Sequence, residues 1–181
     1  MKIFMMIIIM VSFSVLAADS DIDDALLAAI KDSNLSEVHE CLFKGAKVDA
    51  KTPEGLTGLM ISAREGYEEI FNLLIEKGAN VHETTGYGWN ALMYAADGNR
   101  RKIANNLVLK AVNVNAKTKN GDTALMIASS KGRYDMVVFL IENNATAKLK
   151  NNEGQTAYSI AKRKGYTQIM ELLKGAMDAE K

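Results

Sequence analysis

The sequence predicts an all-α solenoid of about five helix-turn-helix units that are joined by short β-turn or hairpin connectors. Three observations predict it: a repeat at fixed spacing, a helix-capping residue in every repeat, and apolar residues at helical spacing between the caps and the stops. Glycines at 55, 88, 121 and 154 mark the repeat, and each step is 33 residues. A fixed period of this size is typical of stacked arrays, in which each unit completes its core with its neighbours.

The first helix of each unit is predicted from its two ends. Residues that accept a hydrogen bond from the free N–H groups at a helix start recur in one register. They are Asp24, Thr57, Asn90, Thr123 and Thr156. Nine residues later come Ser33, Gly66, Asn99, Gly132 and Gly165. Gly and Asn tolerate the left-handed conformation that ends a helix, and Ser33 fits this role least well. Between the two ends, Leu59, Leu92 and Leu125 are expected to anchor the core.

A second helix follows in each unit. Its apolar residues recur at helical spacing, as in Ile70, Phe71, Leu74 and Ile75, in Met136, Val137, Leu140 and Ile141, and in Val38, Cys41 and Leu42. Gly45 and Gly78 are expected to end this helix, and Asn144 does so less strongly. Ala111 breaks the pattern at the same register. Polar connectors then lead back to the next glycine turn.

With period, caps, stops and core positions taken together, the sequence resembles the ankyrin-repeat family. Its unit is a β-turn followed by two antiparallel helices, with a T-P-L-H-x-A signature. The resemblance covers roughly residues 20–175, in five units. The signature proline is Gly or Ala in every matching unit, and the histidine is replaced by Met60, Met93, Met126 or Ser159. We therefore expect Met packing in place of the Thr–His hydrogen bonding that is usual in the family.

The chain is predicted to carry a signal peptide over residues 1–18, an ankyrin-repeat domain over 19–176 and a frayed tail over 177–181. The units are placed at about 19–51, 52–84, 85–117, 118–150 and 151–176. Lys2 precedes an apolar run from Ile3 to Leu16, and small residues fit cleavage after Ala17 or Ala18. The run is short for a membrane span, which needs about 20 residues. We expect an exported chain, periplasmic or secreted, with membrane contact only if the leader is uncleaved.

Catalytic and metal-binding motifs are not recognisable in the sequence. The two histidines, His39 and His82, have no zinc-type spacing, and no nucleophile elbow or P-loop occurs. We therefore expect no enzyme, no metal and no cofactor. Cys41 is interpreted as a small buried hydrophobe rather than an intermolecular disulfide or a redox sensor. The run 100–102 (Arg-Arg-Lys) is interpreted as a solvated face, with anion contact as a minor alternative.

The resemblance implies that partners dock in a concave groove formed by the turn tips and the exposed face of the first helices. The matching residues are Glu54, Leu56, Arg64, Glu65, Tyr87, Trp89, Asp97, Lys119, Asn120, Asp122, Lys131, Glu153, Gln155, Arg163 and Lys164. We expect Tyr87 and Trp89 at the centre, although Trp89 could instead brace its turn. Their mixed charge favours a protein partner over a nucleic acid, and the balance of 22 basic and 22 acidic residues agrees.

The expected function is that of a monomeric, exported scaffold or regulator that binds a partner protein. Three alternatives stay open at this point. One is a membrane-tethered structural spacer that keeps its leader. Another is a secreted effector that acts on a host protein. The last is an enzyme whose site the sequence does not reveal.

Overall fold

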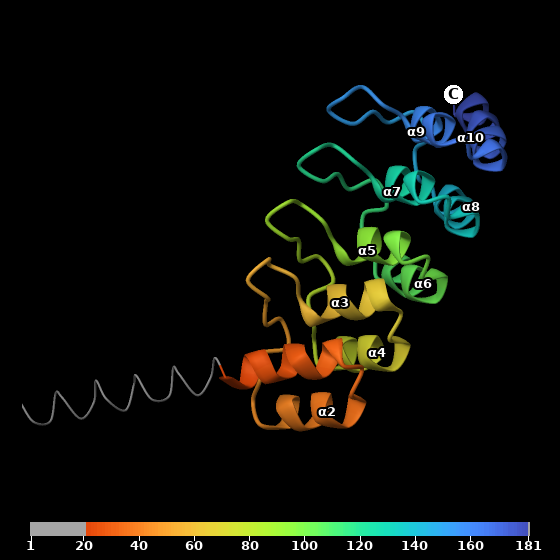
Figure 1. Cartoon of the computed structure of the whole chain (residues 1–181). Helices are drawn as coiled ribbons and strands as arrows, with labels where there is room; N and C mark the ends of the chain where they lie inside the picture. Colours follow the sequence, from red (N-terminus) through yellow and green to blue (C-terminus); the bar gives the residue numbers. More distant parts are fainter. Residues whose placement is uncertain (1–20, 181) are drawn as a thin grey trace, which may run out of the picture.

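A computed structural model describes residues 21–180, so the predicted signal peptide lies outside the described residues. A helix over residues 21–31 comes first. It is followed by α2 (Leu35–Phe43), α3 (Gly58–Glu65), α4 (Glu68–Glu76), α5 (Ala91–Asp97), α6 (Arg101–Leu109), α7 (Ala124–Ser130), α8 (Tyr134–Glu142), α9 (Ala157–Lys164) and α10 (Thr167–Ala179). In Figure 1 the first helices of the pairs stack in one row and the second helices in another, while the connectors project from one side. The predicted all-α solenoid is confirmed.

The remaining backbone agrees with this fold class. In residues 21–180, the β structure consists of isolated antiparallel bridges, Lys51 with Thr57 and Thr84 with Asn90. Both bridges close a connector just before a first helix. Among the described helices, none combines the length and the apolarity that a membrane crossing requires.

The predicted ends of the first helices are confirmed in the repeats from α3 onward. The cap side chains of Thr57, Asn90, Thr123 and Thr156 each accept a hydrogen bond from the backbone N–H three residues later. All five predicted stops have a positive φ, including Ser33 at 56° and Asn99 at 58°. The local residue types therefore determine where these helices begin and end.

The prediction that Asp24 caps the first helix is wrong. Residues 21–24 are already helical, so Asp24 lies inside that helix. Ile22 occupies the register where later repeats have their turn glycine, and here it is itself part of the helix. The neighbouring Asp23 instead accepts a hydrogen bond from the backbone N–H of Lys47 at 2.7 Å, which joins the helix to the first connector.

The predicted tail, residues 177–181, is helical over most of the part that the structure describes. Residues 177–179 belong to α10, which ends at Ala179. The carboxylate of Glu180 accepts hydrogen bonds from the backbone N–H groups of Ala147 and Lys148, the latter at 3.2 Å. These contacts hold the end of α10 against the connector that leads to α9.

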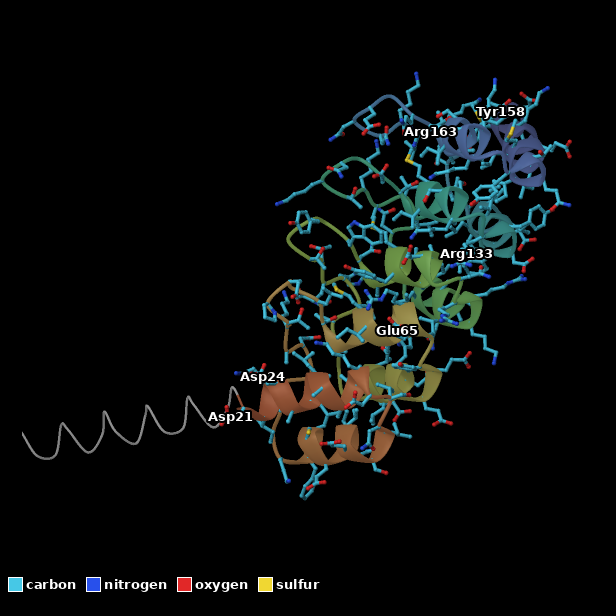
Figure 2. The ribbon with its side chains drawn as sticks, in the orientation of Figure 1. Asp21, Asp24, Glu65, Arg133, Tyr158 and Arg163 are labelled. Carbon is cyan, nitrogen blue, oxygen red and sulfur yellow. The ribbon has the colours of Figure 1, made fainter. Side chains whose placement is uncertain are left out.

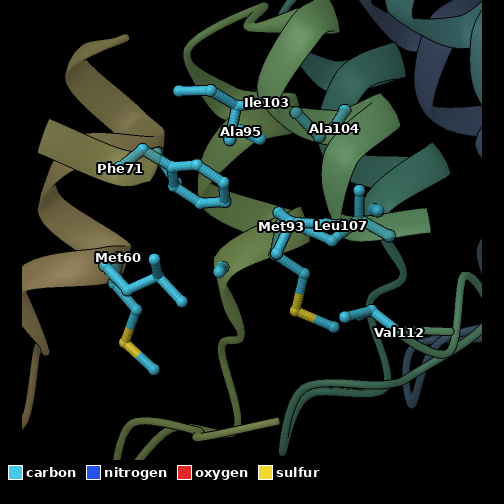
Figure 3. Packing of buried hydrophobic residues seen from close by; sticks show 14 of the residues in the cluster. Met60, Phe71, Met93, Ala95, Ile103, Ala104, Leu107 and Val112 are labelled. Carbon is cyan, nitrogen blue, oxygen red and sulfur yellow. The ribbon is translucent and has the colours of Figure 1, made fainter. Parts of the chain in front are cut away.

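The core follows the repeat. Leu59, Leu92 and Leu125 are each about 1% exposed, and Met60, Met93 and Met126 are equally buried. Figure 3 shows Met93 beside Leu107 and extending toward Val112, so the expected Met packing is confirmed. The array ends in a more polar last pair, in which Ser159 and Lys162 are exposed.

Cys41 lies in the core of the first helix pair, as the sequence predicts. Its side chain is buried in α2, whereas His39 on the same helix is exposed. Burial raises the pKa of the Cys41 thiol above its ordinary value. A higher pKa leaves less of the reactive thiolate at neutral pH, which favours the structural role for this residue.

Ala111→Gly is expected to raise the free energy of unfolding. Ala111 follows α6 with φ 59°, at the register where Gly78 has φ 88°. A Cβ in the left-handed region costs roughly 1–2 kcal/mol, and the extra freedom of Gly in the unfolded chain offsets part of the gain. The net gain should be about 0.5–1 kcal/mol by urea denaturation. The reciprocal control is Gly78→Ala, whose Cβ would meet nothing within 4 Å. It should lose a similar amount, and a less stable Ala111→Gly would contradict the argument.

Candidate binding groove

A groove of about 510 Å³ lies over α5, α7 and α9. A smaller hollow of about 270 Å³ continues its line over α3. Three registers of the repeat line the two hollows. The floor consists of Ile61, Tyr94, Ile127 and Ile160. The hairpin rim consists of Leu56, Trp89, Asp122 and Gln155, and the helix-end rim consists of Lys31, Arg64, Asp97, Ser130 and Arg163.

The hairpin rim is held by a polar residue inside each connector. The side-chain oxygens of Thr52, Thr85, Thr118 and Asn151 accept hydrogen bonds from the backbone N–H of the rim residue four positions later, at 3.3, 3.2, 3.1 and 2.9 Å. Each of these four residues also donates its own backbone N–H to the carbonyl of the same rim residue. The rim side chains therefore project from closed, internally bonded turns.

Neighbouring hairpins are also bonded to each other. The backbone N–H of Lys119 donates to the carbonyl of Tyr87 at 2.9 Å, and that of Asn152 donates to the carbonyl of Asn120 at 2.9 Å. The Asn151 amide donates to the carboxylate of Asp122 at 2.8 Å. These contacts fix the spacing between successive residues of the hairpin rim.

The helix-end rim is fixed by side chains from the next helix pair. Nε of Arg100 donates to the carbonyl of Arg64 at 3.0 Å, and Nε of Arg133 donates to the carbonyl of Asp97 at 3.3 Å. Cations interact favourably with the free carbonyls at a helix C-terminus. Arg100 is exposed, as expected for its charged run, but it also joins two units, which the sequence analysis did not foresee. The positions of Arg133 and of the rim residue Arg163 on the ribbon can be followed in Figure 2.

Aromatic side chains occupy the middle of the groove. The rings of Trp89 and Tyr94 lie 5.1 Å apart at 43°, and both side chains are half-buried. Burial raises the pKa of the Tyr94 phenol above its ordinary value. This contact agrees with a bracing role for Trp89, and the same indole also lines the groove.

The predicted binding residues fall into three groups. Eight line the groove: Arg64, Trp89, Asp97, Asp122, Lys131, Glu153, Gln155 and Arg163. Glu54 and Leu56 line the smaller hollow. The remaining five lie outside both linings, namely Glu65, Tyr87, Lys119, Asn120 and Lys164. Tyr87 is 74% exposed on its turn, so the structure separates it from Trp89.

The floor residues were missed by the sequence analysis. Tyr94, Ile127 and Ile160 lie within the predicted first helices, but none of them was among the predicted groove residues. A signal was present, because each lies three residues before a helix-end rim residue and so shares a helix face with it. The recurring Thr52, Thr85 and Thr118 were a second signal, 33 residues apart like the glycines.

The groove presents apolar surface and hydrogen-bonding side chains. Within residues 21–180, no cluster of three or more His, Cys, Asp or Glu side chains is placed to hold a metal ion. Its charged side chains are of both signs, with Arg64, Lys131 and Arg163 beside Asp97, Asp122 and Glu153. Such a lining suits recognition of a polar and apolar surface together.

Comparison with known protein families gives two matches. A family model described as ankyrin repeats (3 copies) matches residues 26–118, which is just over half of the chain. A second, described as ankyrin repeats (many copies), matches residues 107–161. A comparison with curated proteins finds no match. The two matched segments overlap and run from the first described helix into α9.

Proposed function

Because the chain belongs to the ankyrin-repeat family, we propose that it binds a partner protein through the groove over α5, α7 and α9. Ankyrin repeats are protein-interaction modules, and proteins built from them are typically non-enzymatic scaffolds. The proposal goes further in assigning the binding surface and in making this chain an exported scaffold or regulator.

One observation carries the proposal for the binding surface. Side chains from four successive repeats line a single hollow, with apolar and aromatic groups on the floor and hydrogen-bonding groups on both rims. Apolar anchors surrounded by polar rims are the usual composition of protein interfaces. The hydrogen bonds between hairpins and between helix pairs support a rim that is fixed before binding, which reduces the entropy lost on association.

Export is proposed from the leader sequence. A chain recovered from a cell-envelope or culture fraction should begin at Ala18 or Asp19, since the small residues at 15–18 suit a signal peptidase. N-terminal sequencing of that fraction and intact mass are the measurements. Recovery of Met1 from an envelope fraction would contradict cleavage and favour the membrane-tethered spacer instead.

Trp89→Ala should weaken partner capture by roughly 2 kcal/mol or more, because aromatic groups at the centre of an interface dominate binding energy. The measurement is quantitative cross-linked capture from the native envelope, followed by mass spectrometry. Capture is normalised to the folded fraction, since Trp89 also contacts Tyr94. Tyr87→Ala is expected to weaken capture too, with little change in the melting transition, because its side chain is 74% exposed.

The matched control is Tyr134→Ala. Tyr134 is also an exposed aromatic, at 43%, but it begins α8 and does not line the groove. Its removal should leave capture unchanged. If Trp89→Ala weakens capture only as far as the folded fraction falls, then Trp89 braces the turn and the centre of the interface lies elsewhere.

A further inference from the structure

We propose that the groove takes an acidic segment of a partner protein, in which an Asp or Glu side chain pairs with Arg163 beside an aromatic or aliphatic anchor. The inference rests on the proposed function and adds the chemistry of the partner. The partner's chemistry is inferred by separating the charged side chains of the groove that have an ion-pair or hydrogen-bond partner within the described chain from those that have none.

The carboxylates of the groove have donors within the chain. Asp97 pairs with Lys131 at 3.0 Å, and Asp122 accepts from the Asn151 amide at 2.8 Å. Glu153 accepts from the Gln155 amide at 2.9 Å. A basic partner would have to compete with each of these contacts, so the acidic groups of the groove are poor docking points.

Among the groove cations, Arg163 differs from the other two. Arg64 pairs with Glu65 at 2.8 Å, and Lys131 pairs with Asp97. Within residues 21–180, no ion pair involves Arg163 or its neighbours Lys162 and Lys164. These three cations form the last turn of α9. The C-terminal end of a helix favours cations there, but that effect alone does not explain why one of them lines the groove.

Arginine is suited to a carboxylate partner. Its planar guanidinium presents a fixed fork of donors that matches the two oxygens of Asp or Glu. The flanking Lys162 and Lys164 add positive potential on the same helix turn, and no acidic side chain of the described chain pairs with either of them. Charge complementarity at this end of the groove therefore selects an acidic group.

The anchor is inferred from the floor and from the aromatic residue of the hairpin rim. Tyr94, Ile127 and Ile160 on the floor and Trp89 on that rim present aromatic and aliphatic surface to the same hollow that Arg163 lines. A volume of about 510 Å³ holds side chains rather than a whole folded element. The partner should therefore insert an apolar residue close in sequence to its acidic residue.

The experiment is selection of short random peptides, displayed on phage, against the immobilised full chain. Enriched peptides should carry Asp or Glu near an aromatic or aliphatic residue. Trp89 is the only tryptophan of the sequence, so its emission reports directly on occupation of the groove by a peptide that lacks tryptophan. Affinity of the enriched peptides should fall about tenfold or more in Arg163→Glu, because the pairing becomes repulsive.

Lys174→Glu is the matched control. It makes the same change of charge at an exposed position on α10, outside the groove, and should leave affinity within about twofold. A peptide with Lys in place of its acidic residue should regain binding to Arg163→Glu. Peptides that change Trp89 emission but are basic, or are indifferent to Arg163→Glu, would overturn this inference alone. If no selected peptide changes the emission, both the inference and the proposed groove fail.

Discussion

Leu125→Ala is expected to lower the free energy of unfolding by about 2–5 kcal/mol. Leu125 is 1% exposed and lies in α7, which packs between α5 and α9. Truncation removes buried apolar atoms and leaves a cavity with helices on both sides, so the site collapses poorly. Because a solenoid is held together by contacts between neighbouring units, the loss weakens two interfaces at once.

The control is Leu109→Ala, which removes the same atoms from a side chain that is 77% exposed at the end of α6. It should change stability by no more than about 0.5 kcal/mol. Urea denaturation followed by circular dichroism measures both. A loss below about 1 kcal/mol for Leu125→Ala would place that side chain outside the core, against the buried area that the fold assigns to it.

The elements that the sequence predicts well are those set by local residue types. Caps such as Thr123 and stops such as Gly132 act within one helix, so the register that identifies them also fixes their geometry. The burial of Leu125 is predictable for a similar reason, since an amphipathic helix turns its apolar face toward the core. Even Ser33, the residue type least suited to a stop, adopts the left-handed conformation at the predicted register.

The contacts between units were not predictable in the same way. Arg100 reaches the carbonyl of Arg64, 36 residues earlier, and this requires the angle and spacing between helix pairs. The hydrogen bond from the Lys119 N–H to the Tyr87 carbonyl likewise requires the spacing between neighbouring hairpins. The period of the repeat does not predict these angles and spacings. The groove floor is an intermediate case. The spacing of Tyr94 and Asp97 predicts that they share a helix face, but the contact of the Tyr94 ring with Trp89 on the neighbouring hairpin requires the folded arrangement.

Gly121→Ala is expected to lower the free energy of unfolding by about 2–4 kcal/mol, because it disturbs the packing between the hairpins that form the hairpin rim of the groove. Gly121 has φ 81°, and a Cβ on it would lie 2.8 Å from the backbone N of Asn152 and 3.0 Å from Cα of Asn151. Left-handed strain accounts for roughly 1–2 kcal/mol, and the enforced shift of the next hairpin accounts for roughly 1–3 kcal/mol.

Gly154→Ala separates the two contributions. Gly154 occupies the same register with φ 73°, but a Cβ on it would meet nothing within 4 Å. It should therefore lose only about 1 kcal/mol, from strain that is partly offset by the reduced freedom of the unfolded chain. The difference between the two variants, measured by urea denaturation, is the contribution of hairpin contact. Equal losses would mean that the hairpins do not pack on each other, and that the hairpin rim of the groove is not fixed before a partner binds.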